Sequence, residues 1–193
     1  MNPKFLTGGL LIIGSLLIFA GFGESNDELI TATDHVANIA EDTQRHLITT
    51  LLDMTAVIAM MTGWIFLAQA MNQNGKPGSL FAKVATILPL ICLPIAVAST
   101  GLALSIGWAI EDGLMTEAGI LYGASEGVNS TVFNVLGISW ILLGIAMILQ
   151  KNLHLILAIV VIVVGAALFS SNIVDIEIIW MIAWMGILIV SLA

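Results

Sequence analysis

The sequence predicts an all-α protein, a polytopic transmembrane helical bundle of about six spans with an amphipathic outer helix before the second span. Two observations predict this class. The chain of 193 residues is 59% hydrophobic and only 9% charged, with a mean hydropathy of +1.08. So little polar surface cannot cover a water-soluble globule of this size. Apolar runs of roughly 20 residues, the length that crosses a bilayer, also recur along the chain.

Charged and turn-forming residues mark the ends of the predicted spans. The first span ends before the acidic run that begins at Glu24, and the second stops at the turn formers 72-78, which cannot continue a helix. The third contains Pro89 and Pro94, and the fourth is linked to the fifth around Lys151. We place the six spans of this single transmembrane domain, residues 1-193, at 5-23, 47-71, 80-110, 127-149, 153-169 and 174-193.

The outer segment 25-46, between the first two spans, is predicted to be helical. Residues Ser25 to Glu28 fit a capping box, in which the serine hydroxyl accepts from the glutamate backbone amide. Apolar residues such as Val36 and Ile39 recur at helical spacing while acidic residues point elsewhere, which is typical of an amphipathic helix. Its acidity disfavours docking on anionic lipid, so we expect it to pack on the protein itself or on a partner subunit.

The distribution of charge predicts how the spans are oriented. With the spans placed as above, Lys4, Lys76, Lys83 and Lys151 lie on one side of the membrane, and only Arg45 lies on the other. All 13 Asp and Glu residues fall on the side of the arginine. Because positively charged short loops are retained in the cytoplasm, we predict a multi-pass protein of the cell membrane with cytoplasmic N- and C-termini and acidic outer loops.

Glycine spacing predicts a close helix contact along the fourth span. Gly119, Gly123 and Gly127 are four residues apart, so they form a glycine stripe on which another backbone can approach closely. Gly137 and Gly144 repeat the small surface further along the same helix. The partner is a helix of the same chain or one of a second protomer, and the spacing alone leaves both open.

Polar residues at membrane depth form the first candidate site. Asp53 lies six residues inside the second span, about 9 Å below its outer end, and an ionisable residue at that depth is a functional-site hypothesis by default. Glu126, Ser130 and Asn134 share one helical face at a similar depth. An interhelical hydrogen-bond network, a proton-linked or small-solute pathway, and a metal or catalytic site all remain open. The other members of the predicted cluster are Thr49, Thr50, Ser99 and Thr100.

His46 and Asp42 form the second candidate site, a metal or proton site on the outer side. His46 follows Asp42 by four residues and precedes Asp53 by seven, which places the three near one face of a continuous helix. His35 is about 16 Å away along such a helix, and His154 is predicted at the opposite membrane face. The chain has a single cysteine and no metal-binding or phosphate-binding motif, so no cofactor is predicted.

Two segments of the chain resemble a known group of proteins. The first is Leu47-Ile48-Thr49-Thr50-Leu51-Leu52-Asp53 at the head of the second span, and the second is Gly137-Ile138-Ser139-Trp140-Ile141-Leu142-Leu143-Gly144 before a short inner loop. They are similar to a widespread prokaryotic group of six-helix membrane proteins with no assigned function. The chain departs from that group because its inner loop 150-153 has no proline. The resemblance implies a fold and no activity, so it assigns no site residue.

The sequence favours a function without chemistry of its own. It carries no catalytic constellation, its predicted inner loops are too short for a soluble domain, and it offers two packing surfaces. We therefore expect a structural or accessory subunit of a membrane protein assembly. Its partners would be membrane lipid and other membrane subunits or a second copy, with no nucleic acid. The first alternative is a small proton-linked channel or carrier that uses Asp53 and Glu126, and the second is a membrane metal-binding protein or enzyme that uses His46.

Overall fold

The computed structural model describes residues 3-21, 31-151, 155-170 and 177-192. These residues form seven α-helices and no β-strand, which confirms the all-α class. The helices are α1 (Pro3–Gly21), α2 (Ala32–Glu41), α3 (Thr43–Met71), α4 (Ser79–Glu111), α5 (Met115–Gln150), α6 (Leu155–Ser170) and α7 (Glu177–Leu192).

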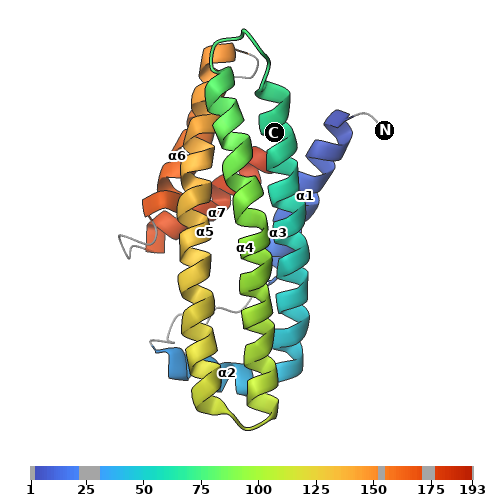
Figure 1. Cartoon of the computed structure of the whole chain (residues 1–193), viewed down its shortest axis with the longest axis vertical. Coiled ribbons are helices and arrows are strands. Elements are labelled where there is room, and N and C mark those ends of the chain that lie inside the picture. The colour runs from blue at the N-terminus through green and yellow to red at the C-terminus, as the bar shows by residue number, and fades with distance from the viewer. Residues whose placement is uncertain (1–2, 22–30, 152–154, 171–176, 193) are drawn as a thin grey trace.

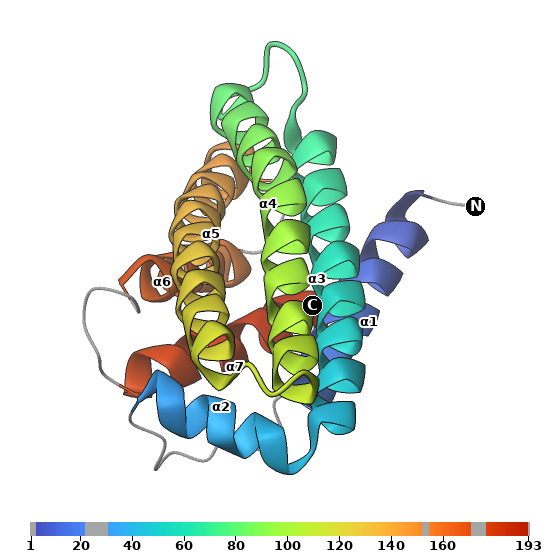
Figure 2. The same ribbon diagram turned by 60° about the horizontal axis from the view of Figure 1, so that its bottom comes forward.

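Six of the helices form a closed ring, and α2 lies across one end of it. In Figure 1, α3, α4 and α5 stand side by side as long rods, with α1 beside α3. α6 packs on α5, α7 packs on α6, and α7 also contacts α1, which closes the ring. Figure 2 shows α2 crossing the end of the bundle beside the tips of α4 and α5. The apolar runs of the sequence therefore fold as a helical bundle.

Three helices of the described chain, α3, α4 and α5, are long and apolar enough to cross a membrane. They contain 29, 33 and 36 residues. At about 1.5 Å per residue they are roughly 44, 50 and 54 Å long, which exceeds the roughly 30 Å of a bilayer's hydrocarbon core. Shorter apolar helices occur within α1 and α6. These lengths support a membrane protein, and the six predicted spans stay a prediction.

α5 extends well beyond the fourth predicted span, 127-149, because it begins at Met115. The span was placed by apolar length, whereas the helix continues into a more polar sequence. Glu117 lies in its first turn, where a negative charge interacts favourably with the helix dipole. Residues 115-132, which the predicted topology makes the outer part of α5, therefore form one continuous helix with the more apolar remainder.

The outer segment consists of two helices rather than one continuous helix. The predicted capping box, Ser25 to Glu28, lies outside the described residues. Thr31 and Asp34 form a capping box for α2, in which the Thr31 hydroxyl accepts from the Asp34 amide at 3.2 Å and the Asp34 carboxylate accepts from the Thr31 amide at 2.9 Å. Asp42 then follows α2 and caps α3, accepting from the Arg45 amide at 3.0 Å. This cap starts a new helix, so the chain changes direction between Glu41 and Thr43.

α2 packs on the protein itself, one of the two outcomes that its acidity predicts. Val36 is only 2% exposed and lies in a cluster with Ile106 and Ala109 of α4 and Ala118 of α5. Ile39 of α2 is partly buried against the same cluster. The apolar face of the amphipathic helix therefore covers the ends of α4 and α5, and its acidic residues remain on the outside.

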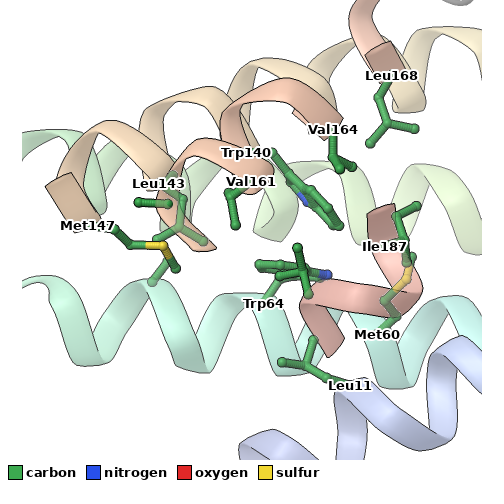
Figure 3. Close-up of a cluster of buried hydrophobic side chains, with 14 of the residues drawn as sticks. Leu11, Met60, Trp64, Trp140, Leu143, Met147, Val161, Val164, Leu168 and Ile187 are labelled. Atoms are coloured by element: carbon green, nitrogen blue, oxygen red, sulfur yellow. The ribbon is translucent and has the colours of Figure 1, made fainter. Parts of the chain in front are cut away.

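The largest core cluster joins helices from both ends of the sequence. Trp64 of α3 and Trp140 of α5 lie with their ring centroids 3.9 Å apart. Figure 3 shows these rings facing each other among Leu11 of α1, Val164 of α6 and Ile187 of α7. All five side chains are buried. Because α1 and α7 both contribute to this cluster, burial of the two tryptophans depends on closure of the ring.

Glycines allow α5 and α6 to pack closely against each other. A Cβ added at Gly137 of α5 would lie 2.6 Å from the carbonyl oxygen of Gly165 in α6, and one added at Gly165 would lie 2.7 Å from the Gly137 oxygen. At Gly144 the Ala158 oxygen of α6 would be 2.8 Å away. α5 and α6 thus approach backbone to backbone, the mode of packing that small residues permit in membranes.

Candidate functional site

Asp53 lies on the buried side of α3, in the half of the bundle that α2 covers. One of its carboxylate oxygens, Oδ1, is fully buried and has no hydrogen-bond partner within the described chain. Ala56 and Met60 follow it at helical spacing and face α1, since a Cβ at Gly14 would lie 2.9 Å from the Ala56 oxygen and 2.7 Å from the Met60 amide nitrogen. Helical spacing therefore places Asp53 on the inner face of α3, toward the last turns of α1.

The polar contact between α4 and α5 uses the predicted Ser99 of α4, but its partners on α5 are not the residues that were predicted. The Ser99 hydroxyl lies 3.0 Å from Oδ1 of Asn129, 3.3 Å from the Ser125 hydroxyl and 3.2 Å from the Ser125 carbonyl oxygen. In return the Ser125 hydroxyl donates to the Ser99 carbonyl oxygen at 3.3 Å. Both serines are buried. This cluster, Ser99, Ser125 and Asn129, satisfies polar groups at a helix interface, which is a common use of serine and asparagine in membrane helices.

The predicted cluster of Asp53 with Glu126, Ser130 and Asn134 does not form as a unit. Within the described chain no hydrogen bond joins Asp53 to any of them, and Glu126 is exposed on α5. Ser130 and Asn134 are partly buried, and each makes an interaction of its own. The face of α5 that contacts α4 includes Ser125 rather than Glu126. Consecutive helix positions differ by about 100° around the axis, so the two residues point in different directions.

A sequence signal for the correct face exists. Ala118, Ser125, Val132 and Ser139 recur every seven residues, and all four are buried. A stripe of small and apolar residues at this spacing is typical of a helix interface. The prediction instead followed the most polar residue, Glu126, and so selected the face that is one position further along the chain.

His46 and Asp42 each make a hydrogen-bond contact to the backbone. Nε2 of His46 lies 3.0 Å from the carbonyl oxygen of Ala103 in α4, while Asp42 caps α3. The described residues contain no group of three or more His, Cys, Asp or Glu side chains that could hold a metal ion. The third histidine, His154, lies outside the described residues. This geometry therefore gives no support to the hypothesis of a metal site at His46.

A polar pocket lies at the corner between α2 and α3. It has a volume of about 260 Å³. His46 and Thr49 line it from α3, and both are partly buried. The Thr49 hydroxyl lies within hydrogen-bond distance of two backbone oxygens of its own helix, 3.1 Å from that of Arg45 and 3.0 Å from that of His46. The complete lining of this corner pocket is Asn38, Ile39, Glu41, Asp42, Arg45, His46 and Thr49.

An aromatic contact that the sequence did not predict holds α2 against α5. The rings of His35 and Tyr122 are stacked, with centroids 4.8 Å apart and an interplanar angle of 16°. Glu126 lies one turn beyond Tyr122 and within electrostatic reach of both rings. No local pattern links residues so far apart in the chain. The contact follows from the way Asp42 turns α2 back across the bundle.

The glycine stripe meets nothing in the described chain. A Cβ added at Gly119, Gly123 or Gly127 would have no atom within 4 Å, whereas Gly137 and Gly144 on the same helix are pressed against α6. Of the five glycines predicted to lie at a close helix contact, two therefore have an intramolecular partner and three face open space.

In comparisons with known proteins, no family model matches this chain, and no curated protein or solved structure matches it either. The resemblance to the prokaryotic six-helix group therefore stays a prediction. Any functional proposal has to rest on the packing, burial and charge of the described residues.

Proposed function

We propose that this protein is a non-catalytic structural or accessory subunit of a membrane protein assembly, and that it docks on its neighbour through the outer part of α5. One observation carries the proposal: the same helix bears two sets of glycines in different surroundings. Gly137 and Gly144 contact α6, while the glycine stripe, Gly119, Gly123 and Gly127, has no neighbour in the described chain.

The energetics of glycine support an external partner for the stripe. A glycine inside a helix costs about 1 kcal/mol relative to alanine, and a close backbone contact offsets that cost where another helix packs on it. Gly137 has such a contact, with the Gly165 oxygen 2.6 Å from an added Cβ. The glycine stripe has the same cost in helix stability but no compensating contact, because the described residues leave this face of α5 uncovered. A second helix from outside the chain would supply it.

The proposed setting is the cell membrane, with six spans, cytoplasmic termini and acidic outer loops. The separation of the four lysines from the carboxylates supports this orientation, and the lengths of α3, α4 and α5 support the spans. In this setting α2 and the glycine stripe belong to the outer half of the molecule. The partner is another membrane subunit or a second copy of this chain.

A pair of matched glycine substitutions tests the proposal. Gly123→Leu fills the centre of the stripe, and Gly101→Leu fills an exposed position of α4 that also has open space around it. Both variants should fold, since a Cβ added at either position has no atom within 4 Å and the side chain can extend away from the bundle. We expect Gly123→Leu to lose the partner or the second copy on mild purification and in crosslinking within native membranes, while Gly101→Leu retains it.

The accessory role would be contradicted by a wild-type protein that stays monomeric and partner-free in native membranes under crosslinking. It would also be contradicted if the Gly123→Leu and Gly101→Leu proteins recovered the same partners in the same amounts. Circular dichroism and thermal unfolding of each purified variant establish that a lost partner reflects the surface rather than the fold.

A further inference from the structure

We propose that Asp53 is a proton-binding site in the outer half of the bundle, and that it exchanges its proton with the outer aqueous side through the corner pocket between α2 and α3. The proposal rests on two observations in the same half of the molecule. The first is the buried Asp53 oxygen without a hydrogen-bond partner in the described chain. The second is a pocket whose lining ends one helical turn away, at Thr49.

The surroundings of Asp53 favour its neutral form. A buried carboxylate without a cationic partner or hydrogen bonds is strongly disfavoured, and such a group takes up a proton instead. The only ionisable residue in the sequence of α1 is Lys4, in the first turn at the opposite end of the helix. The charged residues of α4 are Lys83 near its start and Glu111 at its end. Neither α1 nor α4 therefore brings a charge to the depth of Asp53.

Other titratable groups lie toward the outer end, where they can conduct or sense a proton. On α3 itself His46 is seven residues before Asp53 and shares its face. Because the Ala103 carbonyl oxygen can only accept, Nε2 of His46 carries the hydrogen of their 3.0 Å contact. On α2, His35 is stacked on Tyr122 of α5. In the described chain the other charged residues at this end are the carboxylates Asp34, Glu41, Asp42, Glu111, Asp112, Glu117 and Glu126 and the cation Arg45.

The corner pocket supplies the route to water. It is lined by both His46 and Thr49, and Thr49 precedes Asp53 by one turn, about 6 Å along the helix axis. One or two water molecules can bridge a gap of about that length between polar groups. The Thr49 hydroxyl has lone pairs available to a water molecule, since its hydrogen bonds to the Arg45 and His46 oxygens use it as a donor.

Labelling with dicyclohexylcarbodiimide tests the proton site in the full-length protein in lipid vesicles. The reagent is apolar and reacts with a protonated carboxyl group. The proton passes to a carbodiimide nitrogen as the carboxyl oxygen adds to the central carbon. The O-acylisourea then rearranges to an N-acylurea, so one reagent molecule is added and nothing leaves. We expect peptide mass spectrometry to find the adduct on Asp53 of the unmodified chain, with loss of labelling as the external pH is raised.

Two variants control the labelling. Asp53→Asn should lose the adduct, whereas Glu126→Gln, which changes an exposed carboxylate of α5, should keep it. Because the mapping is made on the wild-type chain, the result does not depend on the folding of either variant. An Asp53 that stays unlabelled at every pH, or is labelled equally at every pH, would overturn the proton-binding proposal.

The route is tested separately with Thr49→Cys and a membrane-impermeant, bulky thiol reagent. The native cysteine, Cys92, is only 2% exposed, so the reagent should react at the pocket alone. After a jump in external pH, we expect the modified protein to show a delayed change in Asp53 labelling relative to the unmodified variant. Equal rates before and after modification would overturn the proposed route. Neither test depends on a partner protein, so its failure is distinguishable from failure of the accessory role.

Discussion

Ser99 joins α4 to α5 with a single hydroxyl, and its contribution to stability can be measured against a neighbour in the same helix. Its hydroxyl lies 3.0 Å from Asn129 Oδ1, while Ser105 donates to the Gly101 oxygen of its own helix at 2.9 Å. Ser99→Ala removes an interhelical bond, and such bonds in membrane proteins contribute on average about 0.6 kcal/mol and at most about 1.7 kcal/mol.

We expect Ser99→Ala to lower the free energy of unfolding in mixed micelles by an amount in that range, measured by titration with a denaturing detergent. Ser105→Ala is the control and should change it less, because only a bond within one helix is lost. A double-mutant cycle of Ser99→Ala with Asn129→Ala should give a stabilising coupling energy between the two side chains. Equal effects of the two serine substitutions would show that the α4 and α5 contact does not depend on this cluster.

Two residue-scale sites show what the sequence could and could not supply. The burial of an Asp53 oxygen could be predicted, because a carboxylate within an apolar run is visible locally. Ser125 and Asn129 could not be separated from the neighbouring face by polarity alone, since the side chain of Glu126 is the most polar and yet faces outward. The stack of His35 on Tyr122 needs the tertiary position of α2, and no helical periodicity encodes that position.

At the scale of helices, replacing a glycine of α5 by alanine should have opposite effects on stability at two positions. Gly144→Ala places a methyl group 2.8 Å from the Ala158 oxygen, and overpacking of this kind costs typically about 1 to 3 kcal/mol. Gly123→Ala meets no atom within 4 Å and gains up to about 1 kcal/mol of helix propensity. We expect thermal unfolding of the purified protein in detergent to show a lower midpoint for Gly144→Ala and an unchanged or higher midpoint for Gly123→Ala.

The same measurement would contradict this assignment of contacts if Gly144→Ala were as stable as the wild type. A lower midpoint for Gly123→Ala would likewise show that the glycine stripe is covered within the monomer. Association has to be held constant in this comparison, because a partner that binds the folded state also raises its apparent stability.

The helices could be predicted where their signals are local, but the break between α2 and α3 and the contact between α1 and α7 could not. Apolar runs bounded by turn formers correctly indicated an all-α bundle, since hydrophobic length and loop chemistry are read within one segment. The break at Asp42 was missed because this residue also suits the polar face of a continuous amphipathic helix, and only its hydrogen bond to the Arg45 amide makes it a cap. Contact between α1 and α7 closes the ring, and sequence spacing does not encode such a long-range pairing.

For the whole molecule, the proposed orientation predicts which loops are reached from outside. Asn74, between α3 and α4, and Asp112, between α4 and α5, are both exposed, whereas the single native cysteine is buried. In right-side-out vesicles we expect a membrane-impermeant maleimide to label Asp112→Cys directly. Asn74→Cys should be labelled only after the membrane is permeabilised, because its loop carries Lys76 and positively charged short loops are retained inside.

The parent chain, with Cys92 alone, gives the background of that experiment and should stay unlabelled. The reverse pattern would invert the topology, and it would move the corner pocket and the glycine stripe to the cytoplasmic side. Labelling of both loops from the same side would mean that α4 does not cross the membrane, although its 33 residues are long enough to do so.

The length of α5 makes the surroundings of its outer part depend on the lipid. The helix is roughly 54 Å long and a bilayer core is roughly 30 Å thick. If α5 crosses the membrane as proposed, part of it lies beyond the hydrocarbon or the helix tilts. Biological membranes differ in thickness by a few Å, about two to three residues of helix rise. In the proposed orientation the Lys151 end of α5 is cytoplasmic. With that end fixed, a thicker bilayer would carry the acyl chains toward Gly127, and a thinner one would leave this glycine among headgroups. Under the proposed docking through the glycine stripe, membrane thickness would tune how strongly a neighbour binds and would favour some membranes over others for this protein.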